Sequence, residues 1–159
     1  MAVNAYLKLD GRPGASTSKK DHIDVLSFSF GATMQHVIGP GSAGAESRVG
    51  RADVHNVTVM KVVDKTSPLL FQDCVTGNIL KTADLIYAKA TGGQQDDYFK
   101  IHMEQVLVTS IQKSGSNENP TESISLAFEK VKVSYNPEEG GKLKGWVEKG
   151  FDLMKLKPW

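Results

Sequence analysis

Apolar and polar side chains alternate along most of this chain, a pattern typical of half-buried β-strands. In one segment Leu26, Phe28 and Phe30 fall on one face. The small hydroxyl side chains of Ser27 and Ser29 fall on the opposite face. The same alternation, or a β-branched composition, predicts strands at residues 5–9, 23–30, 54–63, 79–88, 98–111 and 123–135. Together with weaker segments, the pattern indicates about seven or eight strands.

One short helix is predicted around residues 67–76, inside this otherwise β-rich chain. Ser67 can accept a hydrogen bond from a free N–H of the first turn, and Pro68 follows where its missing N–H costs nothing. Gly77 can adopt the left-handed conformation that ends a helix. Both ends of the helix are therefore marked in the sequence.

The apolar phase of residues 123–135 changes around Glu129 and Lys130. One extra residue in a β-bulge produces such a change, so we predict a bulge there. Bends of this kind help a sheet to curl into a barrel. The predicted fold is therefore mainly β, an antiparallel β-barrel of two packed curved sheets with one flanking helix. We expect residues 1–159 to form a single domain, and the sequence predicts no definite secondary structure for residues 140–159.

The segment from Gly39 to Gly50 differs in composition from the rest of the chain. It contains four glycines, one proline and mostly small side chains. Such a segment cannot form a packed core, so we predict a long extended loop. Loops of this length inside a compact domain are usually functional or disordered, and we expect this one to become ordered against a partner.

Composition and charge narrow the possible functions. The formal net charge is +1, which offers no electrostatic argument for nucleic acid or an anionic membrane. Cys74 is the only cysteine, and its place on the helix predicts a buried structural thiol. No apolar run approaches the roughly 18 residues of a membrane span. The first residues lack the basic start and apolar stretch of a signal peptide, so we expect synthesis in the cytoplasm and export without a cleaved leader.

Candidate catalytic groups are scattered, which argues against an enzyme, a metal site or a cofactor. The four histidines have no metal-ligand spacing and are expected at the surface or at strand edges: His22, His36, His55 and His102. The acidic pairs at residues 96–97 and 138–139 are expected to be solvated charges in loops. Residues 39–44 lack the Lys-Ser/Thr ending of a phosphate loop. A β-barrel that binds a small ligand or single-stranded nucleic acid on its aromatic residues remains an alternative.

Five segments of the sequence form a recognisable series: AVNAYLKL (2–9), HIDVLSFSFG (22–31), KVVDKTSP (61–68), VLVTS (106–110) and LAFEKVKVSY (126–135). In this order they resemble the haemolysin-coregulated protein (Hcp) family of bacterial type VI secretion systems. The resemblance covers about residues 2–137 in the order of the family. Residues 145–146 resemble the family's C-terminal Gly-Trp, but residues 149–159 do not align. They are expected to form a final strand, a docking tail or a short helix.

The resemblance implies a structural protein without catalytic activity. It implies homo-hexameric rings that stack into the inner tube of a contractile injection apparatus and act with sheath, spike and baseplate proteins. Effector proteins would travel in the lumen of the ring, where the ring protein also acts as their chaperone. The protein would assemble in the cytoplasm and then be secreted, without direct membrane insertion.

The resemblance also gives roles to particular residues. Ser27 and Ser29 are expected to line the lumen, although ordinary solvent-facing serines would show the same pattern. The long loop is expected to reach a neighbouring subunit, since a head-to-tail contact can close a ring. Its candidate contact residues are Gly39, Pro40, Gly41, Ser42, Gly44, Glu46, Arg48 and Gly50.

Overall fold

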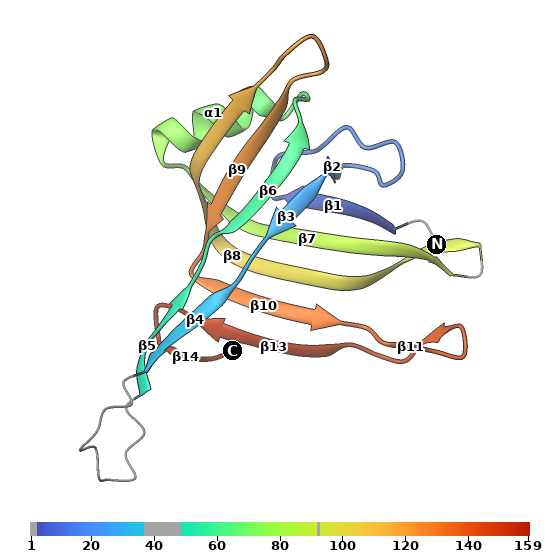
Figure 1. Cartoon of the computed structure of the whole chain (residues 1–159), viewed down its shortest axis with the longest axis vertical. Helices are drawn as coiled ribbons and strands as arrows, with labels where there is room; N and C mark the ends of the chain where they lie inside the picture. Colours follow the sequence, from blue (N-terminus) through green and yellow to red (C-terminus); the bar gives the residue numbers. More distant parts are fainter. Residues whose placement is uncertain (1–2, 37–48, 92) are drawn as a thin grey trace.

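The computed structural model describes residues 3–36, 49–91 and 93–159 (Figure 1). These residues form one helix, α1 (Ser67–Thr76), and strands of very different lengths. The strands are β1 (Val3–Leu9), β2 (Ile23–Val25), β3 (Ser27–Ser29), β4 (Ala32–His36), β5 (Val49–Val54), β6 (Val57–Val62), β7 (Ile79–Thr91), β8 (Gln94–Ser114), β9 (Thr121–Ala127), β10 (Lys130–Tyr135), β11 (Glu138–Glu139), β12 (Lys142–Leu143), β13 (Val147–Asp152) and β14 (Lys157–Pro158). No helix in this described part is long and apolar enough to cross a membrane.

The main strands pair antiparallel, and the series of pairs that begins at β2 and β1 ends at β3, the next strand after β2. β1 pairs with β2 and β7, and β7 pairs with β8. The later part of β8 pairs with β9, β9 with β6, and β6 with β3, which directly follows β2. The predicted mainly β, antiparallel fold of curved sheets with one short helix is therefore confirmed.

The long strand β8 belongs to two sheets and bends between them. At the bend Gln105 has a φ of 53°, in the left-handed region. Beside it β9 ends and β10 begins, and the two strands pair with different parts of β8. The bulge predicted at Glu129 and Lys130 was therefore wrong. The apolar phase changes there because the chain passes from one sheet to the other, so each strand turns its own apolar side to the core.

Apolar side chains from both sheets and from α1 form one core. Its fully buried members include Leu7, Ile23, Val59, Leu70, Leu85, Ile101, Met103, Ile124 and Leu126. Phe28 and Phe30 pack against this core as predicted. Leu26 was predicted on the same face, but its side chain is 60% exposed. The chain bends between β2 and β3 at this residue, and Leu26 and Ser27 both face outward, which shifts the alternation by one position.

Helix α1 has the predicted bounds, but its first residue has a different role. The residue before the helix, Thr66, makes no side-chain cap, and Ser67 is already helical. The Ser67 hydroxyl donates to Glu122 Oε1 at 2.6 Å, so the prediction that it caps the helix was wrong. Gly77 ends the helix with a φ of 67°, as predicted. Cys74 is only partly buried, but it packs against the core.

A buried charged network fixes the start of α1 to the barrel. The Lys61 ammonium donates hydrogen bonds to Glu122, to Asp64 Oδ1 at 3.1 Å and to Ser67 Oγ at 3.3 Å. Lys113 Nζ donates to the second oxygen of Glu122 at 2.6 Å. Burial alone would raise the pKa of Glu122, but the hydrogen bonds from Lys113, Lys61 and Ser67 outweigh it and lower the pKa.

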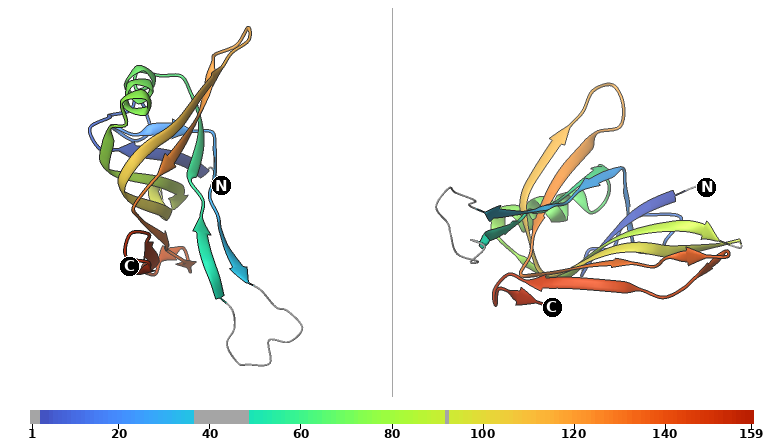
Figure 2. Two further views of the ribbon diagram at one scale, coloured as in Figure 1. Left: turned by 90° about the vertical axis from the view of Figure 1, so that its left-hand side faces the viewer. Right: turned by 60° about the horizontal axis from the view of Figure 1, so that its bottom comes forward.

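Two extensions project from the barrel. Strands β4 and β5 form a two-stranded ribbon, here called the arm, which leads away from the other sheets (Figure 2). Strands β10, β13 and β14 continue the sheet of β1, β7 and β8 beyond β8. The C-terminal segment is thus a strand with a docked end, since the Trp159 N–H donates to the carbonyl oxygen of Gly150 at 3.0 Å. The ring of Trp159 lies 4.3 Å from the Lys132 ammonium.

Candidate functional site

The outward side of four paired strands carries uncharged side chains only, and we call it the hydroxyl face. It is formed by β3, β6, β9 and residues 107–114 of β8. Strand pairing aligns its side chains in three rows across the sheet. The rows are Ser29, Thr58, Ser125 and Ser110; Ser27, Met60, Ser123 and Gln112; and Val62, Thr121 and Ser114.

Side-chain hydroxyl groups form hydrogen bonds between neighbouring strands of this face. Thr58 Oγ1 and Ser125 Oγ are 3.2 Å apart, and Thr109 Oγ1 donates to the carbonyl oxygen of Ser125. Lys61 and Glu122 on these strands point inward and are buried, and Lys113, whose side chain is 42% exposed, turns its ammonium to Glu122 Oε2 at 2.6 Å. The face is therefore polar, shallow and neutral.

Two members of this face were predicted from the sequence, and the others were not. Ser27 and Ser29 are exposed in β3, opposite the inward Phe28. Ser123 and Ser125 alternate with Ile124 in the same way, so the same signal was present in β9. The pairing of β3 with β6, and of β6 with β9, could not be predicted from local alternation. This pairing gathers the separate hydroxyl groups into one surface.

Three aliphatic side chains interrupt the hydroxyl face and form what we call the aliphatic strip. They are Leu26, Met60 and Val62, with 60%, 37% and 38% of their surfaces exposed. Leu26 lies beside β6 because its backbone N–H donates to the carbonyl oxygen of Met60 at 2.8 Å. The strip thus provides apolar contact area within neutral surroundings.

The outward side of the other sheet is charged. His102 Nδ1 lies 2.6 Å from Asp84 Oδ1, and His102 Nε2 lies 3.6 Å from Glu104 Oε2. Lys130 and Lys132 lie over the ring of Trp159 on the same side. The two sheets therefore present chemically different surfaces.

The histidines with described side chains, His22, His55 and His102, do not come together, but not all of them are at the surface. His22 is 8% exposed, and its Nδ1 lies 2.7 Å from the carbonyl oxygen of Lys20, so the prediction of a surface or edge position was wrong for it. The local turn after residue 19 folds the ring inward against Tyr6. Within the described ranges, no group of three or more His, Cys, Asp or Glu side chains could hold a metal ion.

The two acidic pairs are not simply solvated loop charges, as had been expected. Asp97 lies in β8 and pairs with Lys19 at 2.7 Å, and Glu138 lies in β11 and pairs with Lys89 at 2.6 Å. The hydrogen bond from Lys89 to Glu138 raises the pKa of the lysine. These carboxylates hold strands and loops together.

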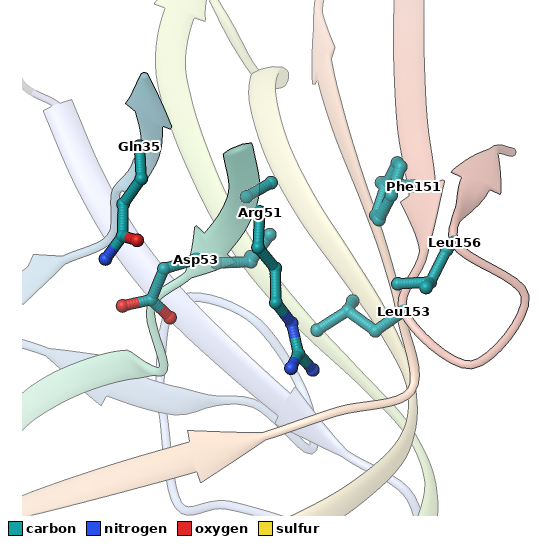
Figure 3. A pocket seen from close by; sticks show the side chains of 8 residues that line it. Gln35, Arg51, Asp53, Phe151, Leu153 and Leu156 are labelled. Carbon is teal, nitrogen blue, oxygen red and sulfur yellow. The ribbon is translucent and has the colours of Figure 1, made fainter. Parts of the chain in front are cut away.

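A pocket of about 330 Å³ lies between the arm and the C-terminal strands (Figure 3). One wall is apolar and the other is mostly polar, and the charged Arg51 and Asp53 on the latter are exposed. Its lining consists of Gln35, Arg51, Ala52, Asp53, Val54, Phe151, Leu153 and Leu156. The pocket thus combines an apolar wall with exposed charged side chains.

The predicted loop contacts fall mostly outside the described residues. Gly39, Pro40, Gly41, Ser42, Gly44, Glu46 and Arg48 are not among them. Gly50 is the exception, and its backbone forms part of β5 in the arm.

Comparison with known proteins decides the family. The sequence model described as "Type VI secretion system effector, Hcp" matches residues 6–135. The chain belongs to the Hcp family. Protein hcp1 of Pseudomonas aeruginosa is 32% identical over 161 residues, covering 98% of each chain. The resemblance inferred from the sequence is thus confirmed.

Solved structures agree with this assignment to the Hcp family. A structure described as a type six secretion system protein has a TM-score of 0.89 and 28% identity, covering 99% of this chain and 100% of the other. The crystal structure of Hcp1 from Salmonella typhimurium has a TM-score of 0.80 and 26% identity, with full coverage of both chains. The chain is therefore a type VI secretion protein of the Hcp family, which implies export.

Proposed function

We propose that this chain is the structural subunit of the inner tube of a type VI secretion system. It forms hexameric rings that stack into a conduit, meets the sheath, spike and baseplate proteins, and carries effector proteins in its lumen as a chaperone. It performs this role without catalysis or a cofactor. The observation that carries the proposal is the match to the Hcp family over residues 6–135.

Exposed apolar side chains support assembly with other copies. Phe71 and Val75 project from α1, and Met154 and Leu156 project from the turn before β14. Exposed clusters of this kind mark contact surfaces in soluble proteins. The two clusters are unlike each other, as a head-to-tail ring contact requires.

The arm supports the same assembly. A two-stranded ribbon is only marginally stable by itself in water, and the described part of the arm pairs with no other strand. We propose that the arm, with the predicted contact loop from Gly39 to Gly50, docks on a neighbouring subunit. The pocket at its base would then receive part of that neighbour (Figure 3).

In this proposal the hydroxyl face lines the lumen. Its neutral and shallow surface suits cargo that must be held and later released. Ser27 and Ser29 are then lumen residues, which extends the expectation from the sequence to the whole face.

Electron microscopy of two matched variants tests this function. Ser29→Gln should leave rings with an open centre in negative stain but lower the amount of co-purified effector. Lys8→Gln places the same side chain at an exposed position opposite Asp84 on the charged sheet, and it should leave both the rings and the amount of co-purified effector unchanged. Absence of annular particles would contradict the ring, and equal cargo in all three proteins would contradict the lumen assignment.

A further inference from the structure

The aliphatic strip is the most exposed apolar area within the hydroxyl face. Met60 stands directly opposite Ser27 in the register of β3 and β6, and Val62 follows two positions later on the same side. Leu26 joins them through its hydrogen bond to the backbone of Met60. Aliphatic area surrounded by hydroxyl groups resembles the apolar centre and polar rim of a protein contact surface.

The charge pattern around the strip restricts the partner. The side chains paired across the hydroxyl face are serine, threonine, glutamine, methionine and valine. A charged group brought against them would lose hydration and gain no opposite charge. An uncharged partner surface loses little hydration and can bury aliphatic area against the strip.

This neutrality is local and does not follow from the overall composition. Charged residues make up 23% of the chain, and the outward side of the other sheet carries Asp84, His102 and Glu104 close together. The charged side chains of these strands pair with one another, since Glu122 binds both the buried Lys61 and the partly exposed Lys113. The charges are thus distributed so that the hydroxyl face stays free of them.

We propose that the hydroxyl face selects cargo polypeptides by neutral surfaces that present aliphatic side chains to Leu26, Met60 and Val62. This proposal rests on the proposed function, because it takes the hydroxyl face as the lumen wall. Each contact is weak, but copies of the strip around a ring act together on one cargo molecule. Retention then depends little on salt, since no ion pair contributes to it.

Fluorescence polarisation with three short labelled peptides tests this selection. The peptides alternate leucine with serine, with glutamate or with lysine, and are titrated with the purified assembled protein. The leucine–serine peptide should bind at least about tenfold more tightly than either charged peptide, which corresponds to about 1.4 kcal/mol. Its affinity should change less than about twofold between low and high salt.

Two matched variants assign the effect to the strip. Met60→Ser should weaken binding of the leucine–serine peptide several-fold, whereas Met60→Leu should preserve it. Preferred binding of a charged peptide, a strong salt dependence, or equal binding by both variants would overturn the proposal. The oligomeric mass of each sample is measured in parallel. A protein without rings contradicts the proposed function, whereas intact rings without this selectivity contradict only the inference.

Discussion

At the scale of single residues, the pair of Arg12 and Asp73 ties the loop after β1 to α1. Arg12 Nε donates to Asp73 Oδ2, and a terminal guanidinium nitrogen donates to Oδ1, both at 2.8 Å. Asn78 Nδ2 donates to the same carboxylate at 3.0 Å. The Asp73 carboxylate is buried, so its charge depends on these donors.

Removing the guanidinium should destabilise the subunit. Arg12→Ala leaves a buried carboxylate with fewer partners, and we expect a loss of about 1–3 kcal/mol in the free energy of unfolding. Arg12→Lys keeps the charge but loses the two-pronged geometry, so it should lose less. Urea denaturation of the three proteins measures this order. Equal stability of wild type and Arg12→Ala would contradict it.

The same pair makes a prediction about acid. The hydrogen bond from Arg12 lowers the pKa of Asp73 in the folded state. The resulting stabilisation is present above the unfolded pKa of about 3.9 and is lost as the pH falls through the lower folded value. The melting temperature of wild type should therefore fall more steeply below about pH 4 than that of Arg12→Ala. Parallel curves for the two proteins would contradict this assignment.

At the scale of elements, two neighbouring residues of α1 differ strongly in the exposed fraction of their side chains. Leu70 is fully buried in the core, whereas Phe71 is 52% exposed. Leu70→Ala should therefore destabilise the subunit by about 2–5 kcal/mol. Phe71→Ala should change stability by only about 0.5 kcal/mol, because most of its ring is already in water. Urea unfolding of the two variants provides the comparison, and equal losses would show that the helix packs differently.

The buried ion pair of Lys61 in β6 and Glu122 in β9 predicts a strong energetic coupling between these two residues. Lys61→Met leaves the Glu122 carboxylate buried without its nearest cation, and we expect a loss of about 3–5 kcal/mol. Replacing both residues by methionine removes both buried charges and should cost less than the single change. A double-mutant cycle in denaturant measures the coupling. Additive losses would mean that the two charges act independently.

The elements also show what the sequence could predict. Residues Pro68 and Gly77 fix the bounds of α1 through local backbone chemistry, so these bounds were predictable. The change of phase at Glu129 was also visible, but its cause was not. A bulge and a change of sheet alter the local pattern in the same way, and only the pairing of β9 and β10 with different parts of β8 distinguishes them.

At the scale of the whole molecule, the two sheets turn different chemistry outward. Ser29 was predicted as a candidate from its own strand, whereas Thr58 and Ser125 became candidates only through pairing. Residues far apart in the chain form the hydroxyl face, and their register is set by long-range packing that no local window contains. The predicted outward orientation of Ser27 and Ser29 is confirmed, whereas their role in the lumen stays a prediction.

At this scale, the arm and the exposed apolar clusters both indicate surfaces for contact with other copies of the chain. The described arm pairs with no other strand, and Phe71 and Leu156 remain exposed. Each of these features leaves contact area unused in a single chain. A ring that joins unlike surfaces of neighbouring copies would cover both the arm and the exposed apolar clusters.

The most direct test of the account is the native mass of the purified full-length protein. Mass spectrometry under native conditions should show a species of six chains that persists on dilution. A protein that remains a single chain even when concentrated would contradict the assembly on which the lumen, the hydroxyl face and cargo transport all depend.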